Sequence, residues 1–179
     1  MIQISEEICL KEILIQDSES LFKLMSEVYP AAYKHFWKDE GQWYLQAQYS
    51  KTNIEKELAQ EQANYYFIVW KGEKVGNFRI LWDTELEGFS GCKQVKLHRI
   101  YLHSKTQGKG IGKQLLTWLE NEAIKKQYEL IWLDAMDEQP QAFTFYKKMG
   151  YQYHSHCFLD FELLHTKVRK MSQVYKKLG

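Results

Sequence analysis

The sequence predicts a single α/β domain spanning residues 1–179, and three observations support this class. A chain of 179 residues is long enough for one compact core and short for two. Strand-like and helix-like hydrophobic patterns follow one another along the chain, with no repeat or linker between them. Charged residues make up 26% and aromatic residues 15% of the chain, which excludes collagen-like and highly charged disordered classes.

The N-terminal third predicts one strand followed by helices. Residues 8–15 alternate apolar and polar side chains as a strand does, and residues 18–29 show helical spacing, with Pro30 expected to end that helix. Residues 29–49 are rich in Tyr, Trp and Phe and predict short helices. Residues 52–62 read as a polar helix capped by Thr52 or Asn53.

The rest of the chain predicts a sheet with two further helices. Strands are expected at residues 65–70, 74–82, 95–103, 130–135, 151–161 and 169–177, the first two forming a hairpin. Residues 83–92 read as a loop. Amphipathic helices are expected from Ile111 to Ala123 and from Gln139 to Met149, where Pro140 suits the first turn and Gly150 suits the C-terminal cap.

Composition also limits location and chemistry. No apolar run approaches the roughly 20 residues that span a bilayer, and the first residues do not resemble a secretory signal, so we expect a cytoplasmic protein without a membrane partner. Three cysteines at wide spacing predict neither a metal site nor a redox pair. Residues 1–90 carry 9 basic and 15 acidic side chains and residues 91–179 carry 15 and 8, which favours a cationic ligand for the first half and an anionic ligand for the second.

A glycine-rich turn joins the strand at residues 95–103 to the next helix. Such a turn leaves backbone N–H groups unpaired at the positive end of a helix dipole, which suits a diphosphate. Gly108, Gly110 and Gly112 let the backbone approach the ligand, and Lys109 and Lys113 add positive charge. Taken alone, the same turn could merely redirect the chain.

The spacing of the turn excludes two common nucleotide motifs. A Walker loop needs Gly at position 107 and Ser or Thr at position 114, where Gln107 and Gln114 stand. A dinucleotide fingerprint needs Gly at position 113 or 115, where Lys113 and Leu115 stand. What remains, Gln-Xaa-Xaa-Gly-Xaa-Gly from Gln107 to Gly112, resembles the pyrophosphate-binding motif of the GCN5-related N-acetyltransferases, the GNAT family.

A second stretch supports the same resemblance. Residues 142–151, Ala-Phe-Thr-Phe-Tyr-Lys-Lys-Met-Gly-Tyr, are similar to the family's Ala-Xaa-Xaa-Phe-Tyr-Xaa-Lys-Xaa-Gly-Phe signature and lie at the expected distance after the first motif. The resemblance implies a central, mixed and largely antiparallel sheet flanked by helices, with an acetyl-CoA-binding core at about residues 93–152. It implies an N-acetyltransferase that takes acetyl-CoA as cosubstrate, uses no metal, and moves the acetyl group directly to a primary amine in a ternary complex.

The resemblance assigns roles to individual residues. The strand before the glycine turn pairs in this family with the pantetheine arm of the cofactor, which carries over to Ile100 and Leu102. Leu102 N–H would also polarise the thioester carbonyl, and Tyr146 would protonate the departing thiolate. The remaining cofactor-binding residues implied are Gln107, Gly108, Lys109, Gly110, Ile111, Gly112, Lys113, Gln139 and Lys148.

Two positions depart from the family pattern. His98 stands where many relatives carry glutamate, and a histidine with a pKa near 6.5 could take the proton of the amine, directly or through water. Strand alternation places His98 on the face of Ile100 and Leu102, where a structural role is the alternative. Gln139 replaces the usual asparagine at the foot of the Tyr146 helix; it keeps the amide but reaches further.

No motif identifies the acceptor. The aromatic residues of 29–49, with Asp39, Glu40 and the acidic first half of the chain, favour a polyamine or another small cationic primary amine, although core packing explains the same aromatics. Arg99-Ile100-Tyr101 and residues 145–150 are also similar to bacterial polyamine acetyltransferases of the spermine/spermidine type.

The alternative to an enzyme is a non-catalytic acyl-CoA sensor of the same fold. A nucleic-acid partner is not expected, because the lysines are scattered, and a homodimer is left open.

Overall fold

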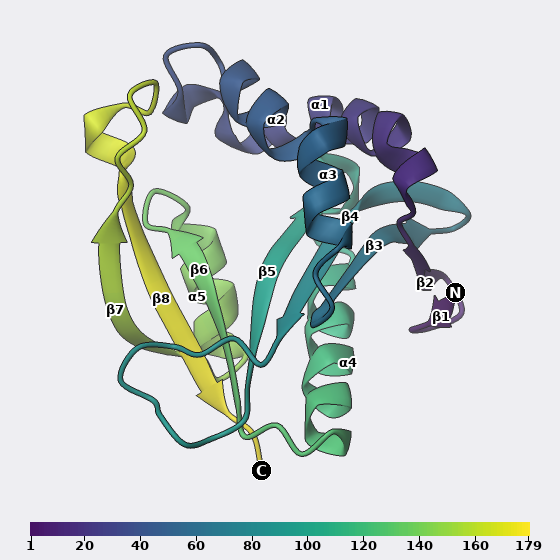
Figure 1. Cartoon of the computed structure of the whole chain (residues 1–179), viewed down its shortest axis with the longest axis vertical. Coiled ribbons are helices and arrows are strands. Elements are labelled where there is room, and N and C mark those ends of the chain that lie inside the picture. Colours follow the sequence, from purple (N-terminus) through teal and green to yellow (C-terminus); the bar gives the residue numbers. More distant parts are fainter.

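The computed structural model describes residues 1–179, and its centre is one eight-stranded sheet (Figure 1). The strands are β1 (Ile2–Gln3), β2 (Ile8–Glu12), β3 (Ala63–Trp70), β4 (Glu73–Trp82), β5 (Gln94–Leu102), β6 (Leu130–Met136), β7 (Gln152–Phe158) and β8 (Lys170–Lys177). Their order across the sheet is β1-β2-β3-β4-β5-β6-β8-β7. All neighbours are antiparallel except β5 and β6, which are parallel, so the predicted mixed and largely antiparallel sheet is confirmed.

Helices cover both faces of this sheet. They are α1 (Ser18–Tyr33), α2 (Gln42–Tyr49), α3 (Lys51–Leu58), α4 (Ile111–Lys125) and α5 (Pro140–Lys148), with single 3₁₀ turns η1 (Ile15–Asp17), η2 (Lys34–Phe36), η3 (Ser104–Thr106) and η4 (Thr166–Val168). Strand alternation divides the core in two. Phe67 packs with α1, α2 and α3 on one face, and its neighbour Ile68 packs with α4 on the other.

Three local expectations are wrong. Pro30 does not end α1, which continues to Tyr33. The helix loses one N–H donor at the proline, and stacking of the Tyr29 and Tyr33 rings, with centroids 4.9 Å apart, stabilises the continued turn. Ser50, and not Thr52 or Asn53, caps α3, because its Oγ accepts from the N–H of Asn53. The first predicted strand is shorter than expected, since β2 ends at Glu12.

A bulge in β5 sets the geometry around the centre of the sheet. Arg79 of β4 pairs with Arg99, but the next residue, Ile80, pairs with Leu97, so His98 is an extra residue without a partner. The parallel pairing of β5 with β6 stops one residue earlier, at Leu97 and Leu133. Beyond that point the two strands diverge, as Figure 1 shows.

No helix of the chain is both long and apolar enough to cross a lipid bilayer.

Candidate active site

The gap between β5 and β6 exposes one edge of β5. Pairing with β4 continues to Leu102, whereas pairing with β6 has ended at Leu97. His103 N–H donates to Val75 of the preceding hairpin, and alternation therefore turns the amides of Ile100 and Leu102 away from β4, toward the gap. These two amides are placed to pair with an extended ligand.

The glycine turn after β5 presents unpaired amides. Gly108 and Gly110 have φ values of +71° and +72°, a region that favours glycine. The first amide of α4 to donate to a backbone carbonyl is that of Gln114, which bonds to Gly110 at 3.1 Å. The preceding amides of residues 110–113 have no backbone acceptor. Together with the helix dipole they form an anion-binding cradle.

These elements enclose a cleft of about 930 Å³. Nine of the eleven residues predicted to bind the cofactor line it: Ile100, Leu102, Gln107, Gly108, Gly110, Ile111, Gly112, Lys113 and Gln139. The sequence reasoning missed several other lining residues, among them Thr106, Ala142 and Phe145. Ala142 and Phe145 lie inside the second motif, so their position in that signature was the available signal.

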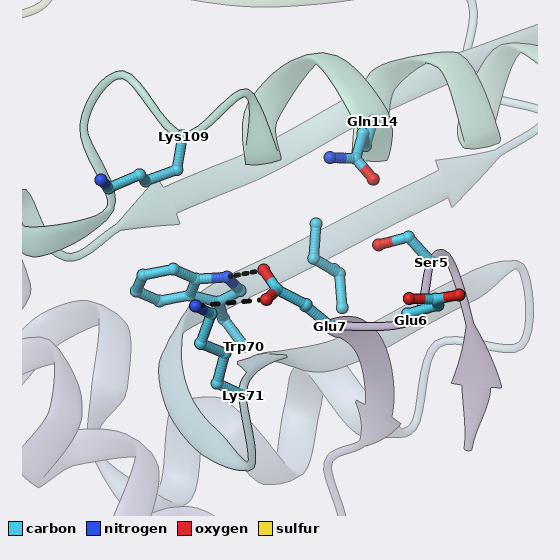
Figure 2. Close-up of a pocket in the computed structure, with 8 residues that line it drawn as sticks. Ser5, Glu6, Glu7, Trp70, Lys71, Lys109 and Gln114 are labelled. Carbon is cyan, nitrogen blue, oxygen red and sulfur yellow. Dashed lines mark hydrogen bonds and ion pairs between the residues drawn. The ribbon is translucent and has the colours of Figure 1, made fainter.

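Two predicted cofactor residues lie elsewhere. The side chain of Lys148 is exposed near the C-terminal end of α5 and does not line the cleft. The side chain of Lys109 faces a separate polar groove, which Figure 2 shows with Gln114 of α4 above and Trp70 below. In this groove Glu7 accepts a hydrogen bond from Trp70 and forms an ion pair with Lys71.

A second cavity of about 280 Å³ adjoins the cleft on the side of α1 and α2. Its walls are mainly aromatic: Tyr29, Tyr33, Phe36, Trp37, Tyr44, Tyr101 and Phe161. The rings pack on one another, with Tyr29 stacked on Tyr44 at 4.5 Å and the hydroxyls of Tyr44 and Tyr101 3.2 Å apart. Gln139 and Ala142 line both spaces, so the two meet at the start of α5.

The carboxylates expected in this wall lie outside the cavity. Asp39 accepts hydrogen bonds from the N–H groups of Gly41 and Trp43 at the start of α2, and it therefore serves as a helix cap. Neither Asp39 nor Glu40 lines the cavity, whose one carboxylate is Asp134. Asp134 forms a 2.6 Å ion pair with Lys96.

Gln139 is buried at the junction and bonded to the protein. Its amide Nε2 donates a 2.9 Å hydrogen bond to the carbonyl of Ala32 in α1, and its Oε1 accepts from Gln141. The residue thus joins α5 to α1 across the place where the two spaces meet.

His98 lines the aromatic cavity, and Ile100 and Leu102 line the cleft. The bulge at His98 shifts the alternation of side chains along β5, so the expectation that His98 shares a face with Ile100 and Leu102 is wrong.

His98 is held by a neighbouring arginine: Arg79 Nη1 lies 2.6 Å from His98 Nδ1. Burial, with Arg99, Arg79 and Lys96 nearby, lowers the pKa of His98 to about 2. A ring with this pKa is a poor proton acceptor near neutral pH, and its surroundings disfavour the base role suggested by sequence.

A buried charge network contacts His98 through Arg79. Arg79 and Arg99 are 2% and 5% exposed, and a single carboxylate, Glu57 of α3, serves both. Glu57 lies 2.6 Å from Arg99 Nη1 and 3.8 Å from Arg79 Nε. Gln48 of α2 accepts from Arg99 Nη2 at 2.7 Å. The sequence reasoning did not identify this network, whose members come from four separate elements.

Tyr146 lies on α5 one turn after Ala142, and it lines neither space. Its ring packs edge-on against Phe145 and Tyr151, with interplanar angles of 61° and 60°. Burial, and to a smaller degree the neighbouring Tyr33, raises the pKa of Tyr146. The phenol therefore keeps its proton at physiological pH.

Comparison with known proteins is consistent with this arrangement. Residues 19–151 match the acetyltransferase (GNAT) family. An N-acetyltransferase encoded in the pepI 3′ region of Lactobacillus delbrueckii subsp. lactis is 24% identical over 117 residues, which cover 65% of this chain and 68% of that protein.

Solved structures share the fold at low identity. The PaiA N-acetyltransferase of Thermoplasma acidophilum, in complex with coenzyme A, superposes with a TM-score of 0.69 at 20% identity, covering 95% of this chain and 98% of that one. The spermidine N-acetyltransferase SpeG of Vibrio cholerae superposes with a TM-score of 0.64 at 15% identity, covering 97% and 95%. The family match spans most of the chain and includes both the glycine turn and the Tyr146 helix, and we conclude that the chain belongs to the GNAT family of N-acetyltransferases.

Proposed function

We propose that acetyl-CoA binds in the cleft formed by the end of β5, the glycine turn and the start of α5, and that its acetyl group passes directly to a primary amine held in the aromatic cavity. The observation that carries this proposal is the junction of the two spaces at Gln139 and Ala142. A donor in one space and an acceptor in the other can meet there without a covalent enzyme intermediate.

The cleft suits a coenzyme A thioester at both ends. The amides of residues 110–113 and the side chain of Lys113 offer a positive cradle to the diphosphate. The free edge of β5 offers the amide of Ile100 to the peptide-like groups of the pantetheine arm and leaves the amide of Leu102 for the thioester.

Bound acetyl-CoA supplies the thioester; transfer forms a bond between the amine nitrogen and the acetyl carbon and breaks the bond from that carbon to sulfur. Leu102 N–H donates to the carbonyl oxygen, where negative charge develops. Tyr146 follows the cleft-lining Phe145 on α5 but does not itself line the cleft, and we propose that its ring turns toward the cleft and donates its phenolic proton to the sulfur as the bond breaks.

The amine must also lose a proton. His98 is held neutral with Nδ1 facing a guanidinium, so we do not assign it this role. Asp134 is the one carboxylate that lines the cavity, and we propose that it or water accepts the proton.

The acceptor proposed here is a primary amine. Asp39 and Glu40 do not line the cavity, so the argument for a polyamine keeps only the aromatic wall, the acidic first half of the chain and the similarity to polyamine acetyltransferases. The fold shared with a spermidine N-acetyltransferase extends to relatives with other acceptors, such as a ribosomal L7/L12 protein acetyltransferase.

The test is a turnover assay with purified protein, acetyl-CoA and a panel of primary amines. We expect amine-dependent release of coenzyme A thiol together with an acetylated amine in the mass spectrum. Tight binding of acetyl-CoA in calorimetry with no thiol release for any amine would instead support the non-catalytic sensor.

A further inference from the structure

The aromatic cavity has a positively charged end. Arg99 lines the cavity. Arg79 does not line it but contacts Nδ1 of the cavity-lining His98. Glu57 is the only carboxylate of this network, so two buried guanidiniums share one negative charge. Arg79 Nε is buried without a hydrogen-bond acceptor. Asp134, on the neighbouring strand β6, is paired with Lys96 and does not offset the excess positive charge. Buried charge without a counter-charge is costly, which favours an anion at this end.

The neutral side chains at this end offer hydrogen-bond donors. A guanidinium can only donate, so Arg79 fixes Nδ1 of His98 as an acceptor and places the ring proton on Nε2. Nε2 makes no hydrogen bond within the protein. Gln48 uses its Oε1 to accept from Arg99, which leaves its amide N–H groups as the free polar atoms. His98 and Gln48 both line the cavity and both present donors.

We infer that the acceptor carries a carboxylate beside its primary amine, and that His98 Nε2–H and the Gln48 amide bind this carboxylate at the Arg99 end of the cavity. The acceptor is then an amino acid or a similar amino-carboxylate. Its apolar or aromatic body lies against the aromatic wall of the cavity, and its amine lies toward Gln139. This inference rests on the proposed acetyl transfer and specifies its acceptor.

Matched acceptors test the inference. Acetylation is measured for the twenty standard amino acids, for the amines that correspond to the aromatic and aliphatic ones without the carboxylate, and for spermidine. We expect kcat/KM for phenylalanine to exceed that for phenethylamine by about tenfold or more, the effect of one charge-assisted hydrogen bond. Phenylalaninamide, which lacks the negative charge, should lie between them.

Two variants of His98 separate recognition from proton transfer. In His98→Gln, the side-chain oxygen can accept from Arg79 while the amide still donates into the cavity, so the preference for the carboxylate should be retained. In His98→Leu, both bonds are lost, and the ratio of kcat/KM between phenylalanine and phenethylamine should fall toward one, mainly through the KM for phenylalanine. Circular dichroism and thermal unfolding check that each variant folds.

The outcomes are distinguishable. Equal or better acetylation of phenethylamine or spermidine would overturn the inference and leave acetyl transfer to an amine intact. Binding of acetyl-CoA with no acetylation of any amino-carboxylate would overturn it as well. Failure to bind acetyl-CoA at all would instead overturn the proposed function.

Discussion

Arg79 donates a hydrogen bond to His98, with Nη1 of the arginine 2.6 Å from Nδ1 of the histidine. The contact fixes the ring in its neutral form with the proton on Nε2. It converts a residue of the right type for a base into a hydrogen-bond donor, and it determines how activity and stability respond to pH.

The first prediction concerns the pH dependence of activity. If the amine itself must be deprotonated, kcat/KM should rise about tenfold per pH unit between pH 6 and 8 for an acceptor whose own pKa lies above 8. His98→Gln should show the same profile, since the native ring has a pKa of about 2 and does not titrate in this range. A change of slope near pH 6.5 in the kcat/KM profile of the native protein, absent from the profile of His98→Gln, would instead show that His98 acts as the base.

The second prediction concerns stability in acid. The pKa of His98 is lowered to about 2 in the folded protein, whereas an unfolded histidine has a pKa near 6.5. Below pH 6.5 the unfolded chain therefore binds a proton that the folded chain does not, and stability falls as pH falls. The groups that face the ring are the cations Arg79, Arg99 and Lys96, with Glu57 behind them.

Urea unfolding at pH 7.5 and 5.5 measures this effect. One proton contributes about 1.4 kcal/mol per pH unit, so the native protein should lose about 1.4 kcal/mol more than His98→Gln between these two values. The other five histidines are present in both proteins and cancel in the comparison. Equal losses would show that His98 protonates freely in the folded state.

The third prediction tests the glycine turn. Gly110→Asp adds a negative side chain to the cradle and should weaken acetyl-CoA binding at least about tenfold in calorimetry. Aspartate is also strained at a φ of +72°, so a matched control is needed. Gly91→Asp, at a φ of +79° in the loop between β4 and β5, introduces the same charge and a similar strain away from the cleft. Equal affinities of the two variants would contradict the assignment.

The fourth prediction concerns Tyr146. Protonation of sulfur matters only as the bond to the acetyl group breaks, so Tyr146→Phe should reduce kcat on the order of a hundredfold and leave acetyl-CoA affinity nearly unchanged. The control is Tyr153→Phe, which removes an exposed hydroxyl on β7. Turnover of Tyr146→Phe at the native rate would remove the residue from the mechanism.

Local patterns predicted the parts of this molecule that depend on neighbours in sequence. The glycine turn, the helix after it and most strands follow from spacing within windows of ten to fifteen residues, and the structure brings most of residues 100–113 to one cleft. The bulge at His98 could not be predicted, because the register of β5 is set by its pairing with β4 and β6. Glu57 and Arg99 are 42 residues apart, and no periodicity indicates that they meet.

The pairing of Arg79 with Arg99 has a consequence for how the chain folds. The two arginines lie opposite each other on neighbouring strands, where like charges oppose pairing. Their shared carboxylate belongs to α3, outside the sheet. The β4–β5 pair is therefore expected to form only as α3 docks, so that both belong to one cooperative step in the folding transition state. Loss of the Glu57 carboxylate would then slow refolding more than it speeds unfolding.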